Sequence, residues 1–158
     1  MRIVVFSDSH TREDRLEKIV AAQPGADYYI HLGDGWTDAQ RLRAAHPGLP
    51  LLTVRGNCDY GCADADTKFL TAGGKKILYT HGHRYNVKYT PDLLRDEAKA
   101  RGADIVLYGH THVQDCSTFD GIYFVNPGAA AQYDGARFAI VDITGRGEVL
   151  CIPASLAP

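Results

Sequence analysis

The sequence predicts an α/β (α+β) fold in which two packed sheets carry helices on their outer faces. Three features indicate it. Short apolar segments alternate with helical patterns in the first third of the chain, which is typical of βαβ units and a parallel sheet. Two strand-like segments then flank Gly73-Gly74, a dipeptide that favours a tight hairpin turn. Beyond residue 113, turn signals separate segments that read as antiparallel strands.

Local patterns locate the individual elements. Apolar or β-branched runs predict strands at residues 2–7, 27–32, 50–55, 66–72, 75–80 and 104–108. Helical periodicity and end signals predict helices at residues 11–23, 37–46 and 91–101. Thr11 and Thr90 stand where an N-cap is expected, and Gly102 follows the last turn of the third helix. Residues 113–152 are expected to form antiparallel strands, broken at 126–128, 134–135 and 145–147.

Length and composition narrow the classes of protein. The 158 residues, with no repeat or linker, are expected to form one domain spanning 1–158. The net charge of -2 argues against strong non-specific binding to nucleic acid. The apolar run that follows Met1 is too short for the core of a secretory signal, and no apolar run reaches about 18 residues, so we expect a cytoplasmic protein with no membrane contact. The cysteines form no CxxC pair and are expected to be reduced thiols: Cys58, Cys62, Cys116 and Cys151.

Polar side chains that can bind metals follow five of the expected strands. They are Asp8 and His10, Asp34, Asn57, His81, and His110 and His112. Ligands of α/β folds bind at the carboxyl ends of the strands, where residues distant in the chain converge. Carboxylate, imidazole and amide oxygen without thiolate suit Mn, Fe, Zn or Ni in a catalytic site. The sequence therefore predicts one metal site at this edge.

The spacing of these residues supports a single site. Asp8 and His10 are two residues apart, which in extended backbone places both side chains on one side. Glycine precedes three of the other candidates, Asp34, Asn57 and His110, and glycine permits sharp turns and close backbone approach. One histidine after a strand is usually an ordinary polar residue, but seven candidates at five strand ends favour a reaction centre.

Five short motifs follow one another along the chain: Asp8-Ser9-His10, Gly33-Asp34, Gly56-Asn57-Cys58-Asp59, Thr80-His81-Gly82-His83 and Gly109-His110-Thr111-His112. Their order resembles that of the calcineurin-like metallophosphoesterases, and most closely the small single-domain YfcE-type phosphodiesterase subgroup. The resemblance implies a four-layer α-β-β-α sandwich of two mixed sheets. It also implies two divalent metal ions, commonly Mn, with Fe, Zn or Ni also used.

The resemblance implies a role for each candidate ligand. Asp8, His10 and His112 would hold the first ion. Asn57, His81 and His110 would hold the second. Asp34 would bridge the two. Two such cations lower the pKa of a shared water, so the expected reaction is in-line attack of a metal-bridging hydroxide on phosphorus.

Asn57, Cys58 and His83 are the candidate catalytic residues. Many members of the family carry histidine directly after the asparagine, where it is credited with protonating the leaving group or holding the phosphate; here the residue is Cys58. A thiol, with a reference pKa of about 8.5, is a poor acid near neutral pH. We therefore expect good leaving groups. His83 either reaches the substrate or is a surface histidine of the loop.

Three functions fit these motifs. The first is hydrolysis of a small phosphodiester, and the second is phosphomonoesterase activity, which differs only in how the pocket closes around the phosphate. The third is a non-catalytic interaction scaffold like the retromer subunit of this fold. The complete set of seven ligands favours an enzyme. Residues 84–90 are a candidate substrate loop or a plain connection, and homo-oligomer formation is left open.

Overall fold

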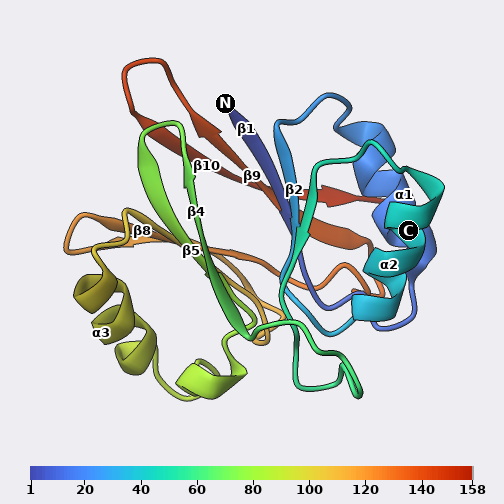
Figure 1. Ribbon diagram of the computed structural model, residues 1–158, viewed down its shortest axis with the longest axis horizontal. Helices are drawn as coiled ribbons and strands as arrows, with labels where there is room; N and C mark the ends of the chain where they lie inside the picture. Colours follow the sequence, from blue (N-terminus) through green and yellow to red (C-terminus); the bar gives the residue numbers. More distant parts are fainter. Residues whose placement is uncertain (158) are drawn as a thin grey trace.

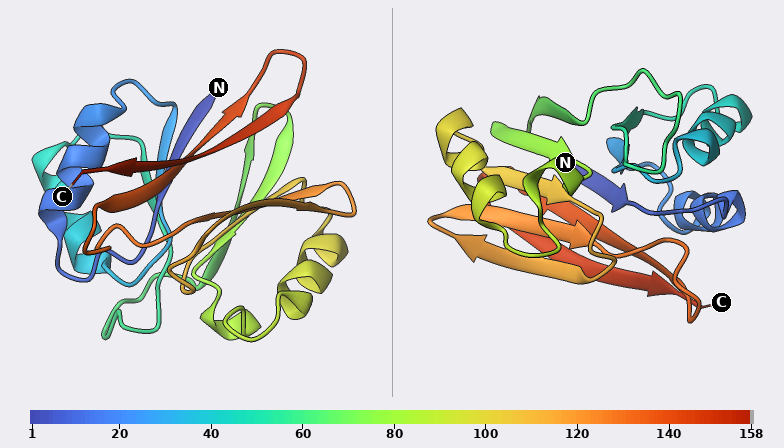
Figure 2. Two further views of the ribbon diagram at one scale, coloured as in Figure 1. Left: turned by 180° about the vertical axis from the view of Figure 1, so that it is seen from behind. Right: turned by 90° about the horizontal axis from the view of Figure 1, so that it is seen from below.

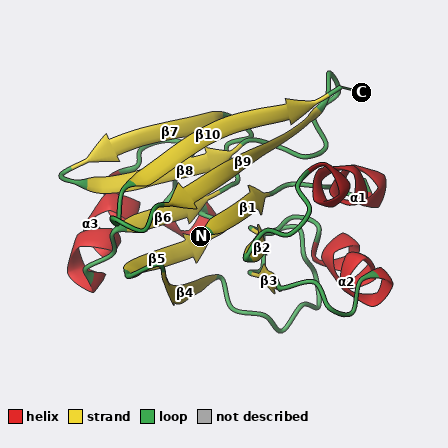
Figure 3. Cartoon of the chain, turned by 90° about the horizontal axis from the view of Figure 1, so that it is seen from above, coloured by secondary structure: helices red, strands yellow, loops and turns green. Residues whose placement is uncertain are grey.

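The structure is a computed structural model that describes residues 1–157. Over this range the chain forms two five-stranded sheets that pack face to face and are flanked by helices (Figure 1). Figure 3, from above, shows the two sheets as separate layers with helices beyond each of them. An aliphatic core fills the space between the sheets. The predicted four-layer sandwich is confirmed.

The first sheet has the strand order β10-β9-β1-β2-β3. Its parallel half consists of β1 (Arg2–Phe6), β2 (Tyr28–His31) and β3 (Leu51–Thr53). Strand β9 (Ala136–Ile143) joins β1 antiparallel, and β10 (Val149–Leu156) forms the edge beside it. Because β1 and β2 are buried on both faces, they read as continuous apolar runs in the sequence.

The second sheet has the order β4-β5-β6-β8-β7. Strands β4 (Thr67–Ala72) and β5 (Lys75–Thr80) form the predicted hairpin. Strand β6 (Ile105–Tyr108) lies parallel to β5 on one side and to β8 (Ile122–Pro127) on the other. Strand β7 (Gln114–Phe119) forms the antiparallel edge. Both sheets are therefore mixed.

The helices cover the outer faces. Figure 2 shows α1 (Glu13–Ala22) and α2 (Trp36–Ala45) on one flank and α3 (Asp92–Arg101) on the other. Each flank has its own apolar cluster against the adjacent sheet. A short 3₁₀ helix, η1 (His83–Tyr85), precedes α3. Among residues 1–157, no helix is both long and apolar enough to cross a membrane.

Two local predictions were wrong. Thr11 does not cap α1, which begins at Glu13; its backbone is left-handed, with φ 70°, and its N–H donates to Asp38. Thr90 does not cap α3, because Pro91 stands at the N-cap position and the helix begins at Asp92. The predicted break at 126–128 is confirmed, because β8 ends at Pro127, which pairs with Gln114 of the edge strand β7. Proline is tolerated there because it lies at the last position of the strand.

The prediction of four reduced thiols was also wrong. Cys116 of β7 and Cys151 of β10 form a disulfide, with Cα atoms 6.1 Å apart. These strands are edges of different sheets, and the packing of the two sheets brings them together across 35 residues of sequence. The other two cysteines are free, Cys58 exposed and Cys62 buried.

Candidate metal centre

The seven predicted ligands come together at the end of the molecule where β1, β2, β3, β5 and β6 finish. Two groups of three side chains could each hold an ion: Asp8, His10 and His112, and Asp34, His81 and His110. Within each group the ligand atoms lie within 4.8 Å of one another. Asn57 joins the second group, with its Oδ1 3.2 Å from Nε2 of His81.

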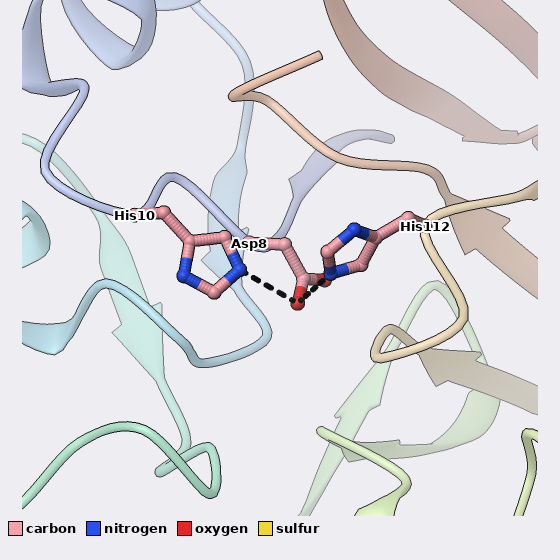
Figure 4. Close-up of side chains that lie close together, drawn as sticks. All are labelled: Asp8, His10 and His112. Carbon is pink, nitrogen blue, oxygen red and sulfur yellow. Dashed lines mark hydrogen bonds and ion pairs between the residues drawn. The ribbon is translucent and has the colours of Figure 1, made fainter.

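In the first group, two imidazoles approach one carboxylate. Figure 4 shows His10 and His112 directed at Asp8 from opposite sides. Their Nε2 atoms lie 3.8 Å and 3.1 Å, respectively, from Oδ1 of Asp8. Asp8 is fully buried, whereas both histidines are exposed. Burial opposes ionisation of Asp8, but the hydrogen bond with His112 and the nearby His81 outweigh it, so the pKa of Asp8 is lowered.

The second group surrounds Nε2 of His81. This nitrogen lies 3.1 Å from Nδ1 of His110 and 3.4 Å from Oδ2 of Asp34. Nδ1 of His81 lies 2.8 Å from the carbonyl oxygen of Leu32, which only accepts, so in the neutral ring Nδ1 carries the proton and Nε2 has the free lone pair. This is the tautomer that binds a metal, with its second nitrogen held by the backbone.

The donor set fits a divalent cation. Burial disfavours the charged form of His81, yet the carboxylate of Asp34 outweighs it and raises the pKa of this imidazole. The second group thus attracts positive charge, as a metal site must. Burial likewise lowers the pKa of His110 to about 4, helped by the charge on His81, so His110 is a neutral ligand at pH 7.

Asp34 connects the second group with His10 of the first. A carboxylate oxygen of Asp34 lies in a cluster with His10 and Cys58, and Asp34 also forms a cluster with His81 and His110. Burial opposes its ionisation, but His81 and the backbone N–H of Cys58, which donates to Oδ1 at 2.7 Å, hold the pKa of Asp34 well below its usual range. Asp34 thus presents an ionised, hydrogen-bonded carboxylate next to both His10 and His81.

The backbone at the ligands is unusual. Within the described residues, eight non-glycine residues have positive φ, and five of them are candidate ligands: Asp8, His10, Asp34, His110 and His112. Each such conformation costs of order 1–3 kcal/mol and persists only where surrounding structure imposes it. Such outliers cluster at functional sites. The strain is therefore independent support for a functional centre here.

Two glycines let the loops that follow β2 and β3 touch. A Cβ on Gly33, whose φ is 95°, would lie 2.5 Å from the backbone nitrogen of Gly56. A Cβ on Gly56 would overlap the carboxylate of Asp34. Only glycine fits at these two positions, which explains why both precede a candidate ligand.

Asp59, which follows the candidate residues Asn57 and Cys58, joins the backbones of two loops. Its carboxylate accepts four backbone N–H groups, those of Asp34, Gly35, Trp36 and Gly56, at 2.7–2.9 Å. A usable signal was present, because aspartate at a glycine-rich turn commonly bonds nearby backbone N–H groups. Its partners 23–25 residues away were not predictable from that signal.

A second network lies behind the first ligand group. His31 is fully buried and accepts the N–H of Gly33 on Nδ1 at 3.1 Å. Its Nε2 therefore carries the proton and donates to Ser9 Oγ at 3.2 Å. Ser9 in turn donates to Asp38 of α2 at 2.6 Å. This chain joins the loop of Asp8 and His10 to the loop of Asp34.

Cys58 and His83 lie beside the ligands. Sγ of Cys58 clusters with His10 and Asp34, and burial together with Asp34 raises the pKa of this thiol to about 11. The ring of His83 lies 5.4 Å from that of His81, and its Nε2 is 3.8 Å from Asp66. Burial lowers the pKa of His83, as does the charge of His81. Cys58 is thus a protonated thiol and His83 a neutral imidazole at pH 7.

A four-layer sandwich with carboxylate and imidazole ligands at its strand ends defines a metal-binding class of α/β protein. The chain belongs to the calcineurin-like phosphoesterase superfamily, whose domain model matches residues 1–146. The resemblance inferred from the five motifs is confirmed.

Individual relatives agree with this family. The probable metallophosphoesterase YsnB of Bacillus subtilis is 37% identical and aligns with 82% of this chain and 75% of its own. The phosphodiesterase YfcE of Escherichia coli is 28% identical, over 83% and 80% of the two chains. A crystal structure from Streptococcus pneumoniae, described as a predicted phosphoesterase, is 29% identical with a TM-score of 0.76, covering 98% and 97%. Vps29 of Entamoeba histolytica, solved with zinc, shares the fold at 21% identity and a TM-score of 0.75, over 98% and 99%.

Proposed function

We propose that this protein is a phosphodiesterase with a binuclear metal centre. The observation that carries the proposal is the position of Asp34, whose ionised carboxylate belongs to ligand clusters on both sides. The family and the relatives support metal-dependent hydrolysis of a phosphoric ester. The relative YfcE is named a phosphodiesterase, which favours a diester over a monoester as the substrate.

In this proposal Asp8, His10 and His112 hold one ion, and Asn57, His81 and His110 hold the other. Asp34 bridges them. When bound, two divalent cations, Mn by expectation and otherwise Fe, Zn or Ni, lower the pKa of a water to provide the nucleophile and neutralise charge on the phosphate. The Leu32 carbonyl fixes the ring of His81, and the N–H of Cys58 fixes the carboxylate of Asp34, so the ligands are pre-organised.

Cys58 and Asn57 are exposed beside this centre, on the side from which an ester would approach in this proposal. The high pKa of the Cys58 thiol makes it a weak acid toward a leaving group. His83 is mostly neutral at pH 7 and so also gives up few protons. The proposed substrate is therefore a small phosphodiester whose leaving group needs no protonation.

The test compares a diester with a monoester. Chelated protein would be assayed with bis-p-nitrophenyl phosphate or p-nitrophenyl phosphate, with and without Mn. The variant Asp34→Asn would be assayed in the same way, with Asp96→Asn as the control because Asp96 lies on the exposed face of α3. Metal content would be measured by mass spectrometry. Mn-dependent cleavage of the diester, with two ions per chain, which Asp34→Asn loses and Asp96→Asn keeps, is the expected result.

Other outcomes would replace the proposal. Cleavage of the monoester alone would make the protein a phosphomonoesterase. If neither ester is cleaved and no metal is bound, the result would favour a role in protein assembly. The similarity to a vacuolar protein sorting-associated protein suggests this alternative. Three expectations stay predictions: the single domain, the cytoplasmic location and the lack of strong non-specific nucleic-acid binding. The oligomeric state is left open.

A further inference from the structure

A pocket of about 330 Å³ adjoins the second ligand group. Its lining includes Arg55, Asn57, Tyr60 and His83, so it lies between the loop after β3 and the start of η1. Its volume is at the lower end for a small-molecule site. Because Asn57 is a proposed metal ligand, a group in this pocket would be next to the reacting phosphate.

A second pocket, of about 250 Å³, lies on the other side of the same loop. His10, Asp34 and Cys58 line it, together with the hydroxyl-bearing Thr11 and Thr37. Asn57 faces one pocket and its neighbour Cys58 the other. The proposed centre therefore has a recess on each side. A phosphodiester has two organic arms, and a monoester has only one, so two recesses suit a diester.

Three side chains that line the first pocket, those of Tyr60, His83 and Arg55, have flat faces. Tyr60 is 92% exposed, so its ring is not used to pack the core. The imidazole of His83 borders the same space. The guanidinium of Arg55 is held by Asp66 through contacts of 2.9 Å and 3.1 Å, which presents a fixed planar cation. Aromatic rings and guanidinium planes bind nucleobases by stacking, worth about 1–3 kcal/mol per base.

We propose that this pocket binds a nucleobase, so that the substrates are diesters with a nucleoside on the arm that the enzyme retains. This rests on the proposed function. Tyr60 provides the stacking surface, and the recess beside Cys58 receives the leaving group. A flexible aliphatic arm, such as glycerol, would gain little from these flat surfaces.

The test uses two diesters with one leaving group. Thymidine 5′-p-nitrophenyl phosphate and methyl p-nitrophenyl phosphate differ only in the retained arm, and both would be assayed with the Mn-loaded protein. We expect kcat/KM to favour the thymidine ester at least about tenfold, the value of one stacked base. Tyr60→Ala should reduce this ratio by about tenfold, and Tyr60→Phe should keep it. Tyr133→Ala is the control and should leave both rates unchanged, because Tyr133 is 87% exposed and is not among the residues that line the pocket.

Binding gives a readout that does not depend on turnover. Thymidine 5′-monophosphate titrated calorimetrically into the metal-loaded protein should bind at least about tenfold more tightly than methyl phosphate, and Tyr60→Ala should abolish the difference. An equal ratio in wild type and Tyr60→Ala, with metal-dependent cleavage of the methyl ester intact, would overturn the nucleobase pocket and leave the phosphodiesterase standing. No cleavage of either ester, with thymidine 5′-monophosphate still bound through Tyr60, would instead overturn the phosphodiesterase.

Discussion

The carboxylate of Asp59 accepts the backbone N–H of Asp34 at 2.9 Å and so ties the loop after β3 to the loop after β2. It also accepts the N–H groups of Gly35 and Trp36 at the start of α2. A carboxylate at a helix N-terminus satisfies N–H groups that the helix leaves free and is favoured by the helix dipole. The bridging ligand of the proposed centre thus depends on a residue that does not bind metal in the proposal.

Replacing Asp59 should therefore weaken both the fold and the metal site. Asp59→Ala removes an acceptor shared by four N–H groups, which should lower the free energy of unfolding by about 3 kcal/mol. Asp59→Asn should lose less, because the amide oxygen still accepts. Denaturant unfolding of the chelated protein measures the first effect, and titration with Mn measures the second. The exposed control Asp96→Ala should change the free energy of unfolding by less than about 0.5 kcal/mol. An equal loss of stability in Asp59→Ala and Asp96→Ala would contradict the role of Asp59.

His31 should make the stability of the metal-free protein depend on pH. Burial lowers the pKa of His31 to about 4 in the fold, below its value of about 6.5 in the unfolded chain. Between these values the unfolded state binds more protons, so this contribution is fully present above pH 6.5 and is lost as the pH falls toward 4. From pH 7.5 to pH 5, His31 should account for about 2 kcal/mol of lost stability.

Comparison with His31→Gln isolates this effect. Unfolding by urea at several pH values should show a shallower pH dependence in the variant between pH 7.5 and 5, whatever its stability at neutral pH. Identical slopes for the two proteins would show that His31 titrates normally in the fold.

Cys58→His should extend the range of leaving groups. An imidazole titrates near neutral pH and can protonate a departing oxygen, which the Cys58 thiol, with a pKa of about 11, does poorly. Turnover of a phenyl diester should rise at least about tenfold, while a p-nitrophenyl diester, whose leaving group needs no proton, should change little. Steady-state kinetics at matched metal content measures both. If the phenyl diester shows no gain with metal content intact, leaving-group protonation is not what Cys58 limits.

The disulfide between Cys116 and Cys151 should stabilise the oxidised protein. It joins the edges of the two sheets and closes a loop of 35 residues in the unfolded chain, for which chain entropy suggests about 3–4 kcal/mol. Unfolding with and without a reductant measures the difference, and Cys116→Ser should match the reduced wild type. The buried free thiol Cys62 provides the control, because Cys62→Ser should stay sensitive to the reductant. Four reactive thiols in unreduced, unfolded protein would rule out the bond.

Much of the fold and the seven candidate ligands could be predicted from the sequence, because the signals are local. The apolar runs of β1 and β2 reflect burial on both faces, and each strand is followed within a few residues by its ligand. The general rule that strand ends converge then placed the ligands together. The spacing of Asp8 and His10 contributed less, since both residues adopt left-handed rather than extended backbone.

Only the tertiary structure decided how these residues are held. Asp59 reaches N–H groups more than 20 residues away, and Cys116 meets Cys151 only because the face-to-face packing of the two sheets brings the edge strands β7 and β10 together. The hydrogen bond of His31 with Ser9 had no sequence signal, because these residues become neighbours only when β1 and β2 pair. Tyr60 carried no signal at all until a pocket formed beside it. Residue type and local order identify the groups that can bind a metal, whereas hydrogen bonds, disulfides and pockets form between segments whose proximity depends on the whole fold.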